Sequence, residues 1–327
     1  MGVITGNQAK LQIGQQSDWS TITACTQAVE FVSETLQYKP GYMTPDYLVG
    51  RKTAGRMDIA GIQVEGDVVM IVTPDNVGLL IAAVLGAEVA PAQVDTSAAY
   101  DHVFTPMSAV AASSLPKLSV KVDRIEQIFG YIGCKIEEMK FASKPQDYLR
   151  ATFTMRGYDE STGVSLESLS YSTLKPLQFK HGTVTVDAAN YADVTSIDFD
   201  YKNNLDSNHF TLGSGDYMAE IEPQMREITM QLQVEYSSAT DSTRTNKFKT
   251  GDTIAIVLTF TSDENADTGV PYSLTFSLPL CYITDASPNV SGPNRIMQTL
   301  AVTATEDASN QACTVTVRDA NGSAYLS

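Results

Sequence analysis

The chain has 327 residues, which is enough for two domains of ordinary size, each with its own hydrophobic core. A composition of 43% hydrophobic and 18% charged residues excludes a disordered or fibrous protein. The formal net charge of −16 excludes a protein that binds nucleic acid by neutralising phosphates, because such binding requires clustered Lys and Arg.

The sequence predicts neither a membrane segment nor a secretion signal. The longest apolar run, residues 77–89, is interrupted by Gly78, Gly86 and Glu88 and is shorter than the roughly 18 to 20 residues that cross a bilayer. Residues 1–6 lack the basic and apolar regions of a signal peptide. We therefore expect no membrane partner and synthesis in the cytoplasm.

One short helix is predicted after residue 72. Thr73 can cap it and Pro74 suits its first position, while Gly86 can end it because glycine readily adopts the left-handed conformation. The apolar stripe of this helix comprises Val77, Leu80, Ile81 and Val84. Residues 87–115, rich in Ala, Ser and Pro, are expected to form a long loop or a partner-binding arm.

Strands are predicted for most of the remaining chain. In residues 228–235, apolar side chains at every second position alternate with polar ones, as in a strand with one buried face. The other candidates are rich in Val, Ile, Thr, Phe and Tyr, which favour sheets. These candidates are residues 118–122, 135–141, 149–155, 253–260, 272–280, 297–305 and 314–318.

The order of short motifs indicates an internal duplication. Ile62-Gln-Val-Glu65 returns as Leu232-Gln-Val-Glu235, and Val29-Glu-Phe31 returns as Ile197-Asp-Phe199. Residues 149–153 similarly resemble residues 297–301. With a boundary near residues 171–176, we predict one domain over residues 1–172 and a second over residues 173–327.

Catalytic and metal-binding patterns are lacking. The three His are far apart in the sequence, and none has a neighbour at metal-ligand spacing. Cys25, Cys134, Cys281 and Cys313 form no paired motif, so we expect free thiols. Adjacent carboxylates such as Glu137 and Glu138 point to opposite faces of a strand and cannot act as an acid/base pair. The sequence therefore predicts no enzyme, no metal and no cofactor.

A set of motifs in the first 157 residues resembles the tail tube proteins (major tail proteins) of long-tailed bacteriophages. The resemblance depends on the order of the motifs, since each of them is weak alone. They are Gly6-Asn-Gln-Ala-Lys-Leu-Gln-Ile-Gly14, Phe31-Val-Ser-Glu-Thr-Leu36, Leu48-Val-Gly-Arg51, Ile71-Val-Thr-Pro-Asp-Asn-Val-Gly-Leu-Leu80 followed by Val84-Leu-Gly86, and Tyr100-Asp-His-Val-Phe-Thr-Pro106.

The resemblance implies an all-β fold with one short helix, built as two tandem tail-tube domains, each a β-barrel or sandwich. It further implies rings that stack into a tube, in the virion tail, around a channel through which DNA passes during ejection. The implied partners are other copies of the chain and the tape measure, tail terminator and distal tail proteins, with DNA only as passing cargo. In the family, rings have sixfold or nearly sixfold symmetry, so two domains per chain favour a trimer over a hexamer.

Other interpretations remain open. The second half could instead be an outward decoration domain, in which case six copies per ring are expected. A β-sandwich binding or adhesion module shares the composition. A carbohydrate-active enzyme is disfavoured because such a groove needs aromatic side chains and the chain has a single Trp, Trp19. The tube of a contractile tail is also disfavoured, because its subunit generally has one domain.

Two sets of residues are candidates for function. The polar faces of two strands are predicted to line the channel, with Gln63, Glu65 and Asp67 in one and Gln231, Gln233 and Glu235 in the other. Residues 37–61 are predicted to form a loop between two strands that reaches a neighbouring subunit or the adjacent ring, because they combine aromatic and basic side chains as an interface would. Its predicted contact residues are Tyr38, Tyr42, Met43, Tyr47, Arg51 and Arg56.

Overall fold

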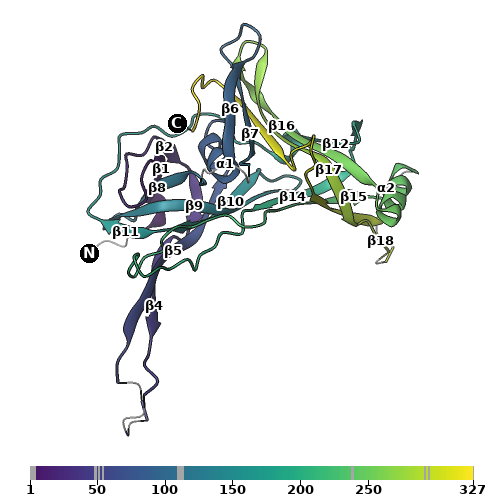
Figure 1. Ribbon diagram of the computed structural model, residues 1–327. Coiled ribbons are helices and arrows are strands. Elements are labelled where there is room, and N and C mark those ends of the chain that lie inside the picture. Colours follow the sequence, from purple (N-terminus) through teal and green to yellow (C-terminus); the bar gives the residue numbers. More distant parts are fainter. Residues whose placement is uncertain are drawn as a thin grey trace.

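The computed structural model describes residues 5–47, 50, 52–53, 55–108, 114–236, 239–290, 292–293 and 295–326 (Figure 1). Strands dominate these residues and the helices are short, which confirms the predicted all-β fold. No helix in the described residues is long and apolar enough to span a membrane.

The first half of the chain, residues 1–172, contains the helix α1 (Gly78–Leu85) and a 3-10 turn at Gly6–Gln8. Its strands are β1 (Lys10–Gln16), β2 (Gln27–Val29), β3 (Phe31–Glu34), β4 (Gln37–Met43), β5 (Asp58–Ile71), β6 (Gly86–Gln93), β7 (Tyr100–Pro106), β8 (Lys117–Asp123), β9 (Ile128–Ser143), β10 (Arg150–Gly157) and β11 (Asp159–Thr162).

The second half, residues 173–327, contains the helix α2 (Ala239–Thr250) and a 3-10 turn at Phe179–His181. Its strands are β12 (Gly182–Val186), β13 (Ala189–Asn190), β14 (Val194–Lys202), β15 (Glu227–Glu235), β16 (Thr253–Asp267), β17 (Val270–Asp285), β18 (Pro288–Asn289), β19 (Met297–Ala304) and β20 (Thr314–Asp319). All the strands predicted by alternation and composition are confirmed.

A continuous central sheet crosses from the first half to the second. Its strands follow the order β3–β5–β10–β9–β14–β15–β19–β17, and all neighbours are antiparallel. The crossing is the ladder between β9 and β14. Figure 1 shows this sheet running from β5 through β10 and β14 to β15. The sheet stays open and does not close into a barrel, so the predicted barrel form is wrong for the single chain.

Two further layers of strands belong to the same fold. The first has the order β2–β1–β8–β9–β11, and the second has the order β6–β7–β20–β17–β16–β12–β13. The long strands β9 and β17 each belong both to the central sheet and to one of these layers. One hydrophobic core includes residues of both halves. Phe276 joins them, because its ring centroid lies 4.9 Å from those of both Phe141 and Phe199.

The two halves repeat the same order of paired strands. The first half pairs β1–β8–β9–β10–β5–β3, and the second pairs β12–β16–β17–β19–β15–β14. A helix follows β5 in one half and β15 in the other. Phe31 lies opposite Met70 and Phe199 lies opposite Met230, so that motif match is in register. By contrast, Ile62 lies beside the β4 hairpin, whereas Leu232 lies in the central sheet between Ile197 and Leu300.

Helix α1 differs from its prediction in two ways. It begins at Gly78 after a turn, and Thr73 does not cap it: the Thr73 backbone N–H donates to Asn76 Oδ1 at 3.0 Å, while its buried hydroxyl has no partner. All the side chains of the helix are buried, because core surrounds it, so there is no one-sided stripe. The predicted end is correct, with Gly86 at φ 84° donating its N–H to Ala82.

The prediction of a long loop over residues 87–115 is wrong for residues 87–106, which contain most of β6 and all of β7. β6 and β7 form a hairpin that pairs with β20 and stands beside the β16–β17 hairpin (Figure 1). The tips of the two hairpins are joined by a 2.6 Å hydrogen bond from Ala98 N–H to Asp267. Helix α2 is a second correction, since one helix was predicted. Phe248 is its only large apolar residue, so it lacks the periodic stripe that identifies helices in a sequence.

Candidate functional site

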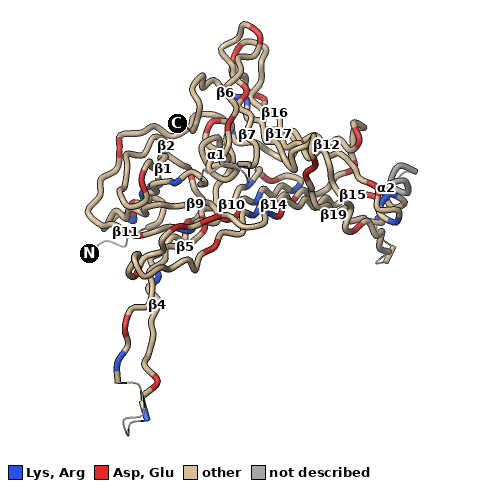
Figure 2. The backbone as a smooth tube through the Cα atoms, viewed as in Figure 1, with Lys and Arg blue, Asp and Glu red and all other residues tan. Residues whose placement is uncertain are grey.

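The central sheet has one apolar and one polar face. Core-facing residues such as Met70, Phe141 and Met230 are buried, and the residues between them are mostly polar and at least partly exposed. This alternation is what a strand with one buried face requires. Figure 2 shows acidic and basic residues side by side along β5, β9, β10 and β14.

Ion pairs connect neighbouring strands across the polar face. Arg156 on β10 lies opposite Glu65 on β5, with Nη1 2.9 Å from Glu65 and Nε 2.7 Å from Glu137. Glu65 also bonds to Lys39 on β4, and this bond, more than Arg156, lowers the pKa of the Glu65 carboxyl against the opposing effect of burial. Thr154 donates a hydrogen bond of 2.7 Å to Asp67 directly opposite.

The same pattern continues where the two halves meet. Lys140 of β9 lies opposite Asp200 of β14, with 3.5 Å between Nζ and the carboxylate. Lys202 lies opposite Glu138 at 3.7 Å. Acidic residues outnumber basic ones on this face. The basic residues are Lys39, Lys140, Arg150, Arg156 and Lys202, and the acidic residues are Glu65, Asp67, Glu138, Asp198, Asp200, Glu227 and Glu235.

The structure brings five of the six predicted channel residues to this face. Glu65 and Asp67 form the cross-strand pairs described above. Gln231 and Gln233 are exposed, and Glu235 is half-buried and bonds to Arg295. Among the strand partners of the two glutamines, Asp198 opposite Gln231 is charged, and the others are Ser196, Thr299 and Ala301.

Gln63, the sixth, lies under another segment of the chain. Its Nε2 donates to the carbonyl of Ser207 at 2.8 Å, and residues 203–226 cross the base of the β4–β5 hairpin there. This crossing segment is held by Lys135, which is fully buried. Lys135 Nζ lies 2.9 Å from Glu220 and donates to the carbonyl of Ile221 at 2.6 Å. Burial lowers the pKa of Lys135, although Glu220 opposes this effect.

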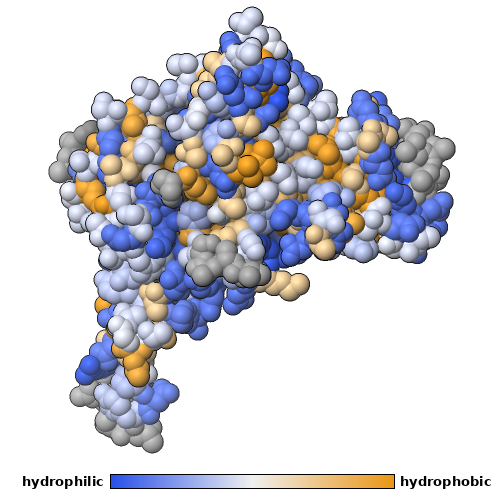
Figure 3. Space-filling model, turned by 45° about the horizontal axis from the view of Figure 1, so that its top comes forward, coloured by the Kyte–Doolittle hydropathy of each residue, from blue (hydrophilic) through white to orange (hydrophobic). Residues whose placement is uncertain are grey.

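Residues 37–43 and 58–61 form the two strands of a projecting hairpin, where a loop was predicted. β4 pairs with the first part of β5, and the hairpin extends far from the body of the protein (Figure 1). Tyr42, Met43 and Tyr47 have exposed fractions of 60%, 56% and 55%, which is unusual for large apolar side chains. Figure 3 shows hydrophobic side chains on this projection among hydrophilic ones.

The remaining predicted interface residues lie at the base or near the tip of the hairpin. Tyr38 is half-buried near the base, and partial burial raises the pKa of its hydroxyl. Arg56 is exposed and donates to Asp58 at 2.7 Å. Arg51 lies outside the described residues.

Asn203, directly after β14, stabilises the contact between the two halves and was not identified from the sequence. Its buried side-chain amide donates to the carbonyls of Val84 in α1, at 3.0 Å, and Ile136 in β9, at 3.1 Å. Its backbone N–H donates to Glu137 at 2.8 Å. No local pattern could have indicated this role, because its partners lie 67 and 119 residues away in the sequence.

A buried histidine cluster holds the end of the chain against the first half. His102, on β7, lies 2.9 Å from Glu88 through Nδ1 and 3.2 Å from Asp319 through Nε2, and all three side chains are almost wholly buried. Burial alone would lower the pKa of His102, but hydrogen bonds to the Asp319 and Glu88 carboxylates outweigh it and raise the pKa to about 9.

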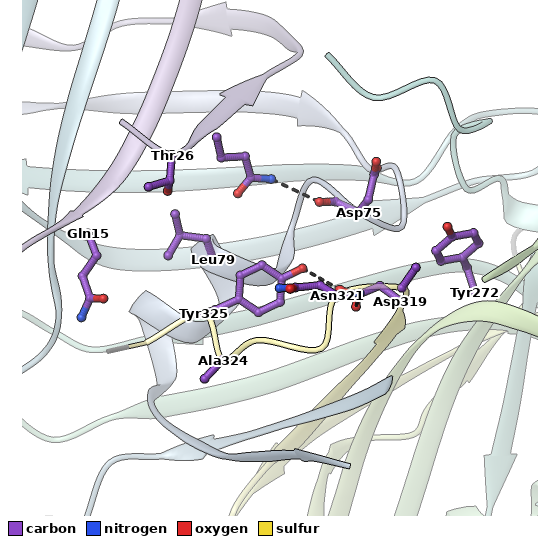
Figure 4. A pocket seen from close by; sticks show the side chains of 11 residues that line it. Gln15, Thr26, Asp75, Leu79, Tyr272, Asp319, Asn321, Ala324 and Tyr325 are labelled. Atoms are coloured by element: carbon purple, nitrogen blue, oxygen red, sulfur yellow. Dashed lines mark hydrogen bonds between the residues drawn. The ribbon is translucent and has the colours of Figure 1, made fainter. Parts of the chain in front are cut away.

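The same cluster binds the C-terminal segment. Glu88 accepts hydrogen bonds from the backbone N–H groups of Tyr325, at 2.8 Å, and Leu326, at 2.9 Å. The Tyr325 hydroxyl donates to Asp319 at 2.5 Å, and its ring lies against Gly78, where any larger residue would clash. Figure 4 shows Tyr325 and Asp319 at the wall of a cavity of about 710 Å³.

Groups that could hold a metal ion are lacking among the described residues: nowhere do three His, Cys, Asp or Glu side chains have suitable placement. The four cysteines are buried free thiols, as predicted. The two features that stand out are therefore surfaces: a charged sheet face with open edges, and a projecting hairpin. Both are suited to contacts between protein chains.

A model of the phage tail tube protein family matches residues 6–304. The chain belongs to this family. The match extends across both halves and confirms the resemblance that motif order indicated. A comparison with curated proteins found no match. As a member of the family, the chain is a structural component of the virion tail, and membership implies self-assembly with other tail proteins into a tube.

Proposed function

We propose that this tail tube protein forms stacked rings around a channel through which DNA passes during ejection. The observation that carries the proposal is the central sheet, which is continuous over eight strands and polar on one face. Its edges are open along β3 and, on β17, from Ile283 onward. Open edges of this kind are satisfied by strands of further copies. Copies joined edge to edge place the polar face of every chain on one side of a curved wall.

The proposed subunit consists of two tandem tail-tube domains, residues 1–172 and 173–327, and three copies form a ring with pseudo-sixfold symmetry. The repeated order of paired strands supports this division. Each half contributes four strands to the central sheet, so three chains supply six equivalent sets. An outward decoration domain would not need to share the strand order of the first half, nor its sheet.

The polar face is proposed to line the channel, with Glu65, Asp67, Gln231, Gln233 and Glu235 among its residues. Acidic residues are in excess there, and most basic ones are paired with carboxylates on neighbouring strands. Such a wall repels phosphates and offers few free cations to bind them, so a polyanion can slide past it.

The projecting hairpin is proposed to contact the adjacent ring or a neighbouring copy through Tyr42, Met43 and Tyr47. Exposed apolar side chains at the end of a long projection have no partner within the described chain, and interfaces are enriched in them. The tape measure, terminator and distal tail proteins are the other proposed partners, and synthesis is proposed to occur in the host cytoplasm.

Negative-stain electron microscopy of the purified chain tests the proposal. Rings or tubes with a central channel are the expected result. A compact monomer at every protein and salt concentration would contradict the proposed assembly.

A further inference from the structure

The ladder between the two halves extends a row of residues that crosses the whole central sheet. In the first half, cross-strand partners on the core face are Phe31, Met70, Ala151 and Phe141 in turn. Phe141 then lies opposite Phe199, the first residue of the row in the second half. The second half continues with Met230, Val302 and Ile283. Each half of the row thus begins with a Phe opposite a Met and ends on β9 or β17.

Both ends of this row lie on free strand edges. In the part of the chain that the structure describes, Phe31 pairs through β3 with β5 alone, and Ile283 pairs through β17 with β19 alone. Thr253 and Ile254 of β16 occupy the positions beside Tyr282 and Cys281, so the free edge of β17 begins at Ile283. By its place in the row, Ile283 in the second half corresponds to Phe141 in the first, and Phe31 corresponds to Phe199. Within the chain, Phe141 and Phe199 already lie opposite each other.

The surfaces beside the two edges both carry exposed apolar groups. A hollow of about 730 Å³ borders the first edge and is lined by Val29, Glu30, Phe31, Asp123, Ile125 and Tyr171 among others. Beside the second edge, Tyr282 and Val290 protrude, with exposed fractions of 45% and 74%. Exposed apolar side chains beside an unpaired strand edge favour association with another chain.

We infer that β17 of one copy joins β3 of the next, with Ile283 beside Phe31, in the register that Phe141 and Phe199 have in the internal ladder. The partner is a second copy of this chain, and the contact is heterologous, so it repeats around a ring. The inference rests on the proposed ring assembly and assigns the residues that close it. The joint is shorter than the internal one, because β16 covers β17 before Ile283.

Engineered disulfides test this register on the full chain. Glu30 precedes Phe31, and Asp285 is the next ladder position after Ile283, because β17 has a bulge between Ile283 and Asp285. Both residues are exposed, so Glu30→Cys/Asp285→Cys places two thiols across the joint. After oxidation of assembled tubes and denaturation without reductant, we expect loss of the monomer band in favour of covalent oligomers that end at three chains. Phe31→Cys/Ile283→Cys is the second pair and should give the same products.

Two matched controls accompany these variants. Ala142→Cys/Asp198→Cys lies at the same position of the internal joint, so it should form a bridge within one chain and leave a monomer band. Ser33→Cys/Asp285→Cys is displaced by two ladder positions, because β3 has a bulge between Phe31 and Ser33. This displacement is roughly 7 Å along the strand, and together with the spacing between strands it places the two Cα atoms beyond disulfide reach. This variant should remain monomeric.

The outcomes separate the inference from the proposed function. Normal tubes without a disulfide in either test pair, or with equal cross-linking in the displaced control, would overturn the assigned joint and leave the tube function standing. Failure of the unmodified chain to assemble at all would overturn the ring proposal and this inference with it.

Discussion

The two halves of the molecule differ in the segment that connects two equivalent pairs of strands, β3 to β5 in the first half and β14 to β15 in the second. In the first half, the chain between β3 and β5 leaves the body as the exposed β4–β5 hairpin. In the second half, the chain between β14 and β15, residues 203–226, folds back onto the first half, where Lys135 binds Glu220 and Trp19 Nε1 lies 3.4 Å from the Met218 carbonyl. Equivalent connections in the two halves therefore have opposite placements: one extends away from the body of the protein and the other packs against it.

This difference separates two kinds of contact. The inward segment buries its polar anchor and stabilises a single chain, whereas the outward hairpin leaves apolar side chains in solvent and does little for the isolated protein. Changes to the hairpin should therefore affect assembly, and changes to the inward contacts should affect folding.

Deletion of the hairpin tip, residues 45–56, should have the largest effect on assembly. The deleted residues contribute nothing to either hydrophobic cluster of the described chain, so the protein should fold with an unchanged melting temperature. Tubes should be absent in electron micrographs, because the contact to a neighbouring copy is lost. Normal tubes from the deleted chain would show that the hairpin is not an assembly contact.

Removal of the inward anchor should affect folding instead. Lys135→Ala removes the cation from a fully buried site and should lower the free energy of unfolding by about 3 kcal/mol, as expected when one partner of a buried pair is lost. Denaturant titration measures the loss. The control Lys144→Ala, at an exposed turn, should change the stability by less than about 0.5 kcal/mol. Equal effects of the two substitutions would contradict the anchoring role.

The histidine cluster should make the second half's closure onto the first sensitive to pH. Since the folded pKa of His102 is raised to about 9 from its ordinary value of 6.5, its stabilising contribution is complete below the unfolded value and is lost as the pH rises through 9. The loss should approach about 3 kcal/mol. Thermal melts of His102→Gln should lack this dependence, while the control His209→Gln, at an exposed position, should keep it. A wild-type melting temperature that is constant from pH 6 to 9.5 would contradict the cluster's protonation.

A single cation on the polar face should have the smallest effect and act only on DNA passage. Gln233→Lys adds a charge at an exposed position of the proposed channel wall, where phosphate contacts retard DNA. Phage carrying it should assemble normally but eject DNA several-fold more slowly at low salt, with recovery at high salt. Ser309→Lys adds the same charge on an exposed loop and is the control. Identical ejection rates for both variants would place the polar face outside the channel.

The sequence predicted the strands well and their long-range partners poorly. Alternation is a local property, so residues 228–235 and the other periodic segments could be recognised, and Phe31 and Phe199 were correctly matched. Helix α2, the β6–β7 hairpin and the His102 cluster depend on contacts far along the chain. His102 and Asp319, for example, are 217 residues apart, and nothing near either residue indicates the other.

For the candidate site, the sequence placed Glu65, Asp67, Gln231, Gln233 and Glu235 on polar strand faces, which alternation alone determines. It could not show that the two strands share one sheet, because this depends on the β9–β14 ladder. Gln63 was placed by the same rule, yet it lies against Ser207 because a distant segment crosses there.

The symmetry of the assembled tube tests the account most directly, since two equivalent halves per chain lead to three chains per ring. A cryo-electron microscopy reconstruction should show threefold true symmetry, an approximate sixfold arrangement of domains and one polar face lining the lumen. Six chains in each ring, with the second halves outside the wall, would contradict the account.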